Sequence, residues 1–420
     1  MARGARGRPS PATWLGALGG LVAGAALGAV AAWLWMRPPP PPLPDALTLS
    51  PAAFADLPGW ADDDLAEALP AIRVSCARIA GLKPESPLGP GGSAADWSAF
   101  CAGIASLPAD GAAIRAFLEE RAAPLLAGNN GVAEGLFTGY YEPLLEGSRT
   151  PGGRHSVPLL ARPDDLVMVE LGRFREGLRG ERVAGRVEGG ALVPYPDRAA
   201  IARGALGERA RPIVWLADPV DAFFLHIQGS GRVALAEGGE MRVGYAAQNG
   251  HPYVAIGREL VRRGALPKDG VTMPAIRDWL AAHPDEAAGV LDANPSYVFF
   301  RELPMPTGPI DGPPGAENVP LSAGRSLAVD RKFLALGLPL WLDTTVPSPD
   351  GAARPLRRLM VAQDTGGAIR GPVRGDVFWG RGPEAERMAG AMKQPGRYWL
   401  IVPKEVAARA APPGAGGGGG

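Results

Sequence analysis

The sequence predicts a mainly β protein whose N-terminal part is α-helical. Residues 60–126 carry apolar side chains at helical spacing, with acidic residues in the first turn. From Leu136 onward, short runs of β-branched and aromatic residues alternate with glycine and proline, as in strands joined by turns. The chain has 59 glycines and 45 prolines among 420 residues, which also favours a turn-rich body.

The elements follow in order. One helix is predicted from Asp96 through Ser106 and another from Asp110 through Leu126; a third spans 255–263 and two more lie between Met273 and Leu291. The main predicted strands are G-L-F-T-G-Y-Y-E-P (135–143), S-V-P-L-L-A-R (156–162), P-I-V-W-L-A (212–217), P-S-Y-V-F-F-R-E (295–302), P-L-W-L (339–342), L-R-R-L-M-V-A-Q-D (356–364) and R-Y-W-L-I-V-P (397–403).

The N-terminus predicts a membrane anchor. Arg3, Arg6 and Arg8 precede an apolar segment, 14–36, of 23 residues, which is long enough to cross a bilayer. The arginines place residues 1–13 in the cytoplasm and the body outside it. A cleaved signal peptide is the alternative. No cysteine stands directly after the segment, so a lipid-modified N-terminal cysteine is excluded, and the Pro-rich residues 37–45 form a stiff linker.

Charge and cysteine content exclude several classes of protein. Lys plus Arg and Asp plus Glu both number 43, so no basic excess favours nucleic-acid binding. The four histidines lack metal-ligand spacing, and we expect no metal and no cofactor. Cys76 and Cys101 lie in predicted helices, where a disulfide and two buried thiols both remain open.

The most informative segment runs from Asp364 to Gly382, a glycine-rich stretch with two carboxylates, Asp364 and Asp376. An acid held beside Phe378 and Trp379 could be desolvated, and desolvation lets a carboxylic acid donate a proton near neutral pH. The competing interpretation is a turn cluster with solvated aspartates. D-T-G at Asp364 also matches aspartic proteases, but that chemistry needs two such motifs and the chain has one.

Two further segments suit a carbohydrate site. F-T-G-Y-Y-E-P (137–143) combines aromatic rings with a hydroxyl and a carboxylate, although a half-buried strand has the same composition. Q-G-S-G (228–231) lacks the features of a phosphate loop and of a nucleophile elbow. It could bind a sugar or a peptide, or be only a tight turn.

Seven motifs in order resemble one family, the membrane-bound lytic transglycosylase A family of bacterial murein-cleaving enzymes. They cover most of residues 130–400, and their order is specific. The motifs are G-L-F-T-G-Y-Y-E-P (135–143), D-P-V-D-A-F-F-L-H-I-Q-G-S-G (218–231), V-G-Y-A-A-Q-N-G-H-P-Y-V-A-I-G (243–257), N-P-S-Y-V-F-F (294–300), V-P-L-S-A-G-R-S-L-A-V-D (319–330), L-M-V-A-Q-D-T-G-G-A-I-R-G (359–371) and G-D-V-F-W-G-R-G-P-E-A-E-R-M-A-G (375–390).

The resemblance implies a fold of two domains with a glycan groove between them. A double-psi β-barrel domain would comprise residues 46–143 and 266–405, and a smaller inserted β domain would comprise 144–265. The tail, 406–420, is expected to be disordered.

The resemblance also implies site residues. The family's catalytic aspartate falls on Asp376, while Asp364 and Asp330 match supporting aspartates. The glycan-contacting positions fall on Thr138, Tyr140, Tyr141, Gln228, Gly229 and Ser230.

The implied activity is lytic transglycosylation of peptidoglycan, in which a single aspartate serves as acid and then base. The expected partners are glycan strands, the membrane through the N-terminal segment, and cell-wall synthesis or division proteins, but no nucleic acid. The body is expected in the periplasm of a Gram-negative envelope, anchored to the inner membrane; outer-membrane and cleaved soluble forms stay open. The alternatives are a non-catalytic peptidoglycan-binding barrel and the aspartic protease.

Overall fold

The computed structural model describes residues 43–306, 308–347 and 353–410. The predicted cytoplasmic N-terminus 1–13, the anchor 14–36 and most of the linker 37–45 lie outside these residues. The residues from Asp45 onward form one compact unit. None of the helices within the described ranges has the length and apolar character needed to cross a membrane.

The N-terminal helices pack on the barrel in one apolar core. They are α2 (Leu69–Ala80), α3 (Ser98–Ser106) and α4 (Gly111–Arg121). A disulfide joins Cys76 of α2 to Cys101 of α3, which decides between the two states that the sequence left open. Asp110 caps α4 by accepting a hydrogen bond from the Ala113 amide.

The prediction that this last helix continues to Leu126 is wrong. The chain turns into β2 (Ala122–Asn129) directly after Arg121. Pro124 cannot donate a helical hydrogen bond, and β2 instead pairs with strands on both of its sides.

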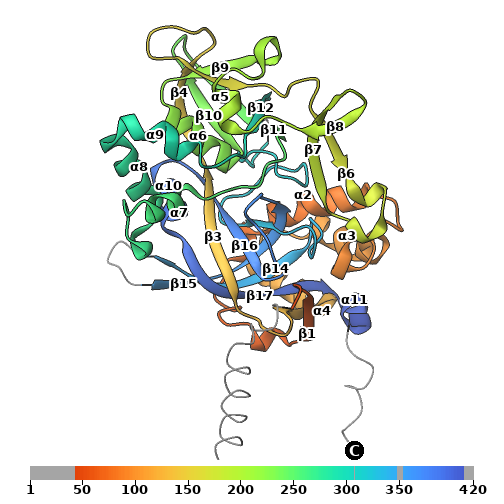
Figure 1. Ribbon diagram of the computed structural model, residues 1–420. Helices are drawn as coiled ribbons and strands as arrows, with labels where there is room; N and C mark the ends of the chain where they lie inside the picture. The colour runs from red at the N-terminus through yellow and green to blue at the C-terminus, as the bar shows by residue number, and fades with distance from the viewer. Residues whose placement is uncertain (1–42, 307, 348–352, 411–420) are drawn as a thin grey trace, which may run out of the picture. The chain divides into compact units, whose positions relative to one another are not determined.

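Six strands close into a barrel, in whose wall β3 lies beside β16 (Figure 1). They follow one another in the order β17, β14, β15, β13, β16 and β3, and β3 pairs back onto β17, so this ring of described strands has no free edge. β2 and then β1 (Leu47–Pro51) extend the sheet from β17. The barrel strands are β3 (Gly135–Glu142), β13 (Ser326–Val329), β14 (Pro339–Pro347), β15 (Ala353–Asp364), β16 (Arg374–Arg381) and β17 (Lys393–Pro403).

A second, six-stranded sheet interrupts the barrel between β3 and β13. Its strands, in spatial order, are β12 (Val298–Leu303), β11 (Glu240–Gln248), β10 (Ser230–Leu235), β4 (Leu144–Ser148), β9 (Pro212–Leu216) and β5 (Val157–Leu160). A separate sheet contains β6 (Val167–Glu170), β7 (Arg182–Glu188) and β8 (Ala191–Pro194). The predicted fold class, N-terminal helices with a barrel and an inserted β domain, is confirmed.

Helices accompany the inserted sheet. They are α5 (Arg198–Ala202), α6 (Pro219–Gln228), α7 (Ile256–Arg262), α8 (Met273–Ala282) and α9 (Pro284–Leu291). The last three match predicted helices, whereas α5 and α6 were not predicted. The insert boundaries of 144–265 stay a prediction; β12 lies beyond them and pairs with β11 inside them.

The tail that was predicted to be disordered, 406–420, begins inside a helix. After α10 (Pro383–Ala391) and β17, residues 404–410 form α11 (Lys404–Ala410), so the prediction is wrong for 406–410. Val406 is buried against the barrel core and Arg409 forms an ion pair with Asp96 at 2.8 Å. Residues 411–420 lie outside the described part of the chain.

Buried ion pairs tie the inserted sheet to the barrel. Glu142, at the end of β3, accepts hydrogen bonds from Arg232 of β10 and Arg242 of β11 at 3.1 and 3.2 Å. All three side chains are at least 95% buried. Arg232 also pairs with Asp311, which in turn binds Arg381 at the end of β16. The carboxylate of Glu142 therefore neutralises two cations at the junction.

Replacing Glu142 with Gln should destabilise the fold by about 3 kcal/mol, because two buried guanidinium groups would lose their shared counter-charge. Urea denaturation of the soluble body, residues 45–410, measures this. The control is Arg149→Met, which removes the exposed pair with Glu302 and should change stability little. Equal midpoints for both variants would contradict this role of Glu142.

Candidate active site

The two acidic residues singled out in the sequence flank one residue of β13. Ala328 is the register partner of Asp376 on the antiparallel neighbour β16 and of Asp364 on the parallel neighbour β15. Thr138 of β3 is the partner of Asp376 on its other side. Neighbouring strands lie about 4.8 Å apart, so the backbones of the two aspartates are about 10 Å apart.

These residues occupy the outer face of the barrel wall. Phe137, Leu327 and Val377 belong to the barrel core, and because strand side chains alternate, Thr138, Ala328 and Asp376 lie on the opposite face. Tyr140 and Phe378 share that face and pack together with ring centroids 5.2 Å apart. Of the two aromatic residues predicted beside Asp376, Phe378 is therefore the one on its face, while Trp379 lies against Gly139.

A β-bulge turns Asp364 toward this face. Leu327 pairs with Ala362, but the next residue, Ala328, pairs with Asp364, so Gln363 is the extra residue of β15. Gln363 is fully buried and donates hydrogen bonds to Ala71 O and Ser75 Oγ of α2, at 3.0 and 2.9 Å. Its Oε1 accepts a hydrogen bond from Ser326. The bulge is thus anchored to a helix far away in the sequence.

Asp364 is held through both carboxyl oxygens. Tyr140 donates its hydroxyl proton to Oδ2 at 2.8 Å, and the Ala316 amide donates to Oδ1 at 2.9 Å. Burial raises the pKa of Asp364, and these hydrogen bonds oppose the rise because they favour the ionised form. Burial and the Asp364 charge raise the pKa of Tyr140 well above its ordinary value.

Asp376 is half-buried and is held through one oxygen. The Thr138 hydroxyl donates to Oδ1, and no second hydrogen-bond partner of this carboxyl is found among the described residues. Burial raises the pKa of Asp376, and the Asp364 charge adds to the rise, whereas the Arg374 guanidinium and the Thr138 hydrogen bond lower it. Asp376 also interacts electrostatically with Tyr253: the pKa of that phenol is raised mainly by desolvation, and the charge of Asp376 adds to the rise.

Asp330, predicted as a third supporting acid, has a structural position. Its carboxylate accepts hydrogen bonds from the Lys332 amide at 3.0 Å and from the Gly371 amide at 2.8 Å. Gly371 has a φ of 108°, which residues with a side chain rarely adopt but glycine adopts readily, and this contact fixes that turn in the loop between the other two aspartates.

The predicted glycan contacts divide into two groups. Thr138 and Tyr140 contact the two acids directly. Tyr141 faces away from them: it is buried against α10, and its hydroxyl donates to Glu386 at 2.9 Å. Burial, with the Glu386 charge, raises the pKa of Tyr141.

The predicted Q-G-S-G loop lies where α6 ends and β10 begins. Gln228 is buried, and its Oε1 accepts a hydrogen bond from the Tyr141 amide at 3.0 Å, which brings the loop beside β3. Gly229 ends α6 with a φ of 79°, the left-handed conformation that glycine adopts without strain. Ser230 begins β10 and is buried.

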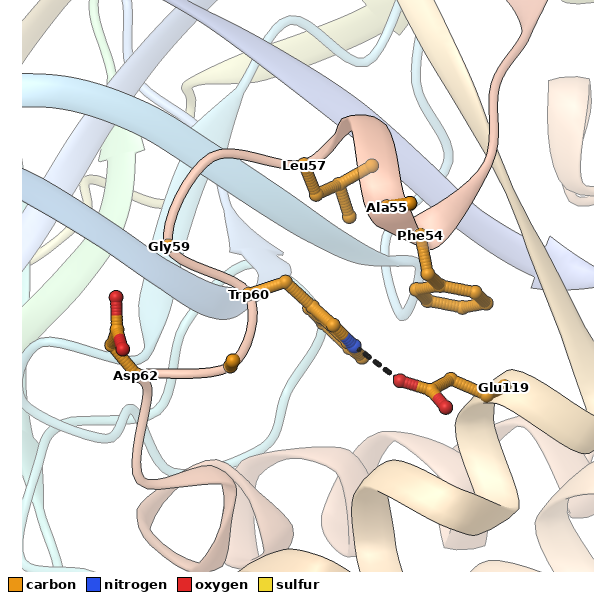
Figure 2. A pocket seen from close by; sticks show the side chains of 8 residues that line it. Phe54, Ala55, Leu57, Gly59, Trp60, Asp62 and Glu119 are labelled. Atoms are coloured by element: carbon orange, nitrogen blue, oxygen red, sulfur yellow. Dashed lines mark hydrogen bonds between the residues drawn. The ribbon is translucent and has the colours of Figure 1, made fainter.

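Of two surface hollows in the described residues, one is remote from the predicted site residues and the other borders them. One, of about 450 Å³, is lined by Glu119 and by several residues between Phe54 and Asp62, among them Trp60, which donates to Glu119 at 2.8 Å (Figure 2). None of the predicted site residues lines it. A second, of about 370 Å³, is bordered by Leu136, Arg374 and residues of the loop 368–373. Because Arg374 precedes Asp376 by two residues on β16, this hollow lies next to the two acids. No group of three or more acidic, His or Cys side chains in the described ranges could hold a metal.

Comparison with known proteins places this geometry in a family. The model of the MltA specific insert domain matches residues 136–301, and that of the 3D domain matches 325–402. The crystal structure of a membrane-bound lytic murein transglycosylase from Agrobacterium tumefaciens is 36% identical, covers 87% of this chain and 100% of its own, and superposes with a TM-score of 0.76. The chain belongs to the membrane-bound lytic murein transglycosylase A family.

Two relatives from Escherichia coli give further detail on this family. The membrane-bound lytic murein transglycosylase A of E. coli K12 is 33% identical over 269 residues. These are 63% of this chain and 65% of that protein, just under two thirds of its length. The crystal structure of E. coli MltA with bound chitohexaose is 28% identical, covers 86% of this chain and 92% of its own, and has a TM-score of 0.60. This chain is therefore a homologue of lytic murein transglycosylases.

Two residues beside the acids were not predicted from the sequence. Arg374 lies two positions before Asp376 on one strand, so the alternation of side chains could have placed it on the same face. Tyr253 lies in a loop of the insert, and only the folded chain brings it near Asp376.

Gln363→Met should lower the free energy of unfolding by about 3 kcal/mol, because it removes three buried hydrogen bonds while keeping the volume. Chemical denaturation measures this. As a control, Gln394→Met on β17, where the side chain is half-buried, should change stability by less than about 0.5 kcal/mol. Comparable losses in both variants would contradict the anchoring of the bulge by Gln363.

Proposed function

We propose that the protein is a peptidoglycan lytic transglycosylase. It cleaves the β-1,4 bond between N-acetylmuramic acid and N-acetylglucosamine and forms 1,6-anhydromuramic acid, with Asp376 as the single acid and base. The observation that carries this proposal is the unequal bonding of two desolvated carboxyls: both oxygens of Asp364 accept hydrogen bonds, whereas Asp376 accepts one.

This inequality supports different protonation states for the two acids. A carboxyl that accepts hydrogen bonds at both oxygens is stabilised as an anion, so Asp364 is the ionised member. The negative charge of Asp364 then raises the pKa of Asp376 and favours its protonated form. The second oxygen of Asp376 remains available to carry the proton and to donate it to a substrate.

The reaction needs no protein nucleophile. Asp376 protonates the glycosidic oxygen, and the bond from that oxygen to C1 of the muramoyl ring breaks. The C6 hydroxyl of the same ring then forms a bond to C1, and its proton passes to the Asp376 carboxylate, which restores the acid. A hydrolase would typically use a second carboxylate. An internal hydroxyl replaces it, with an effective molarity on the order of 10⁵ M or more.

The remaining site residues take supporting roles in this proposal. Asp364 raises the pKa of the acid, Asp330 holds the loop between the acids, and Gln228, Gly229 and Ser230 contact the glycan from the insert. Thr138, Tyr140 and Tyr141 were expected to contact glycan as well. Tyr141 is buried and its hydroxyl donates to Glu386, so we propose that it supports β3 on the face that packs against α10.

Asp376→Asn should abolish the release of 1,6-anhydromuropeptides, since the amide cannot donate the proton and then accept it back. Purified murein sacculi are digested with the soluble body, residues 45–410, which keeps α11, and the products are weighed by mass spectrometry. The thermal transition should persist, because Asn can still accept from Thr138.

Three outcomes would contradict parts of this proposal. Retained activity in the Asp376→Asn variant would move the acid to Asp364. Wild-type products one water heavier, with a reducing end, would mean a hydrolase with a second catalytic carboxylate. Murein bound but never digested would mean a non-catalytic binder.

The pH profile of the wild-type enzyme has an expected direction. Asp376 must be protonated to start the reaction, so activity falls as the pH rises through its pKa. Because burial raises this pKa, the fall should come at a higher pH than the ordinary aspartate value of about 3.9.

Gln228→Glu separates glycan binding from stability at the insert loop. Glutamate keeps an oxygen to accept from the Tyr141 amide but loses the amide donor, for which no partner is found among the described residues. Affinity for chitohexaose, measured by calorimetry, should fall about tenfold, and the melting temperature should fall less than in Gln228→Ala, since the Tyr141 amide stays paired. Gln228→Ala should lower both, since it leaves the buried amide of Tyr141 unpaired. Unchanged affinity in Gln228→Glu would remove Gln228 from the glycan site.

We also propose a place in the envelope. The relatives are named as membrane-bound, and the apolar segment 14–36 supports anchoring of a periplasmic body to the inner membrane of a Gram-negative cell. The proposed domains, 46–143 with 266–405 and the insert 144–265, would hold a glycan strand in the groove between them. Assembly with cell-wall synthesis or division proteins remains an expectation.

A further inference from the structure

Arg374 is a half-buried cation beside the acid of the proposed reaction. It lies on β16 two residues before Asp376, and on the same face. Its Nη2 donates to Thr138 Oγ1 at 2.8 Å, and its Nη1 donates to the carbonyls of Leu136 and Gly375. Among the described residues, no carboxylate lies within ion-pair distance of this guanidinium.

The contacts of Arg374 define the direction of a hydrogen-bond chain. A guanidinium can only donate, so the oxygen of Thr138 accepts from Arg374. The Thr138 hydroxyl proton then points to Asp376 Oδ1, for no other acceptor of this proton is found in the described ranges. An oxygen that accepts this hydrogen bond is a poor place for a second proton.

We propose that Arg374 is a positioning residue that acts through Thr138 to keep the acidic proton on Oδ2 of Asp376, the oxygen offered to the substrate. This inference rests on the proposed function for its chemical meaning. It also changes the expectation for Thr138 from a glycan contact to a link between Arg374 and the acid.

The hydrogen bonds that lead from Arg374 through Thr138 to Asp376 act in both steps of the proposed reaction. When the Oδ2–H bond breaks, the proton goes to the glycosidic oxygen and the electron pair stays on Oδ2, while Oδ1 keeps its hydrogen bond from Thr138. When the muramoyl O6–H bond breaks, its proton returns to Oδ2 and O6 bonds to C1. The guanidinium also attracts the carboxylate formed between the two steps.

The other charged and titratable groups around Asp376 cannot replace Arg374. Asp364 on β15 is an acid that raises the pKa of Asp376. Tyr140 on β3 and Tyr253 in the insert are phenols whose own pKa values are raised mainly by burial, so both stay neutral. Lys393 on β17 is the register partner of Thr138 but is exposed.

A titration of the free protein tests the inference without activity. The soluble body carries ¹³C-labelled aspartate carboxyls, and Asp376→Asn assigns the signal of Asp376. In Arg374→Met the pKa of Asp376 should move upward, because the cation that lowers it is gone. Arg374→Lys keeps the charge and should stay close to wild type. Arg370→Met is the control: this exposed arginine donates to Gly367 O, away from the acid.

Kinetics on sacculi then test the link through Thr138. Arg374→Met and Thr138→Val should each lower kcat by about tenfold, with a smaller change in KM, since each breaks the same chain. The double variant should lose no more than either single variant. In Arg374→Met, activity should fall at a higher pH than in the wild type, and this pH should shift together with the pKa of Asp376.

The outcomes separate the inference from the proposed function. An unchanged Asp376 titration in Arg374→Met, or independent and multiplying losses of kcat, would overturn the inference and leave Arg374 as a support for β3. Wild-type digestion without anhydro products would overturn the proposed function, while the titration would still report whether Arg374 and Thr138 control the carboxyl.

Discussion

The structure depends on the pairing of β3 with two strands from the far end of the chain. β3 lies between β16 and β17, and this closes the barrel. Its alternate residues serve opposite sides, with Phe137 in the core and Thr138 and Tyr140 on the acids. Its close approach to the loop before β16 requires Gly135, where a Cβ would meet Val373 O at 1.7 Å. The strand that closes the barrel therefore also brings Thr138 and Tyr140 to the two acids.

Desolvation raises the pKa of both acids, and hydrogen bonds lower the two values to different extents. A buried carboxyl with few donors tends to be protonated, and one with a full set of donors tends to be ionised. The protein gives Asp364 a phenol and an amide, and gives Asp376 one hydroxyl. In the proposed reaction, two identical side chains on one face of the barrel thereby take different protonation states.

The insert is held to the same strand that carries the site. Glu142 ends β3 in a buried pair with two arginines of the inserted sheet, and Gln228 binds the Tyr141 amide one residue earlier. Both contacts link the insert to backbone that is already constrained by the barrel. A glycan held by the insert would then meet Asp376 in a defined position, which a site built from separate flexible segments could not provide.

The sequence by itself determined the class of the fold, most of the strands, the helices over 255–291 and the family, because local periodicity and motif order carry that information. It also pointed to Asp364 and Asp376, since two acids in a glycine-rich segment stand out locally. Only the tertiary structure decided the end of α4, the helix α11, the disulfide and the bulge at Gln363. Each of these depends on partners distant in sequence: Gln363 meets Ser75 across 288 residues, and Arg374 meets Thr138 across 236. No local pattern encodes such contacts, and they set the bonding of each acid.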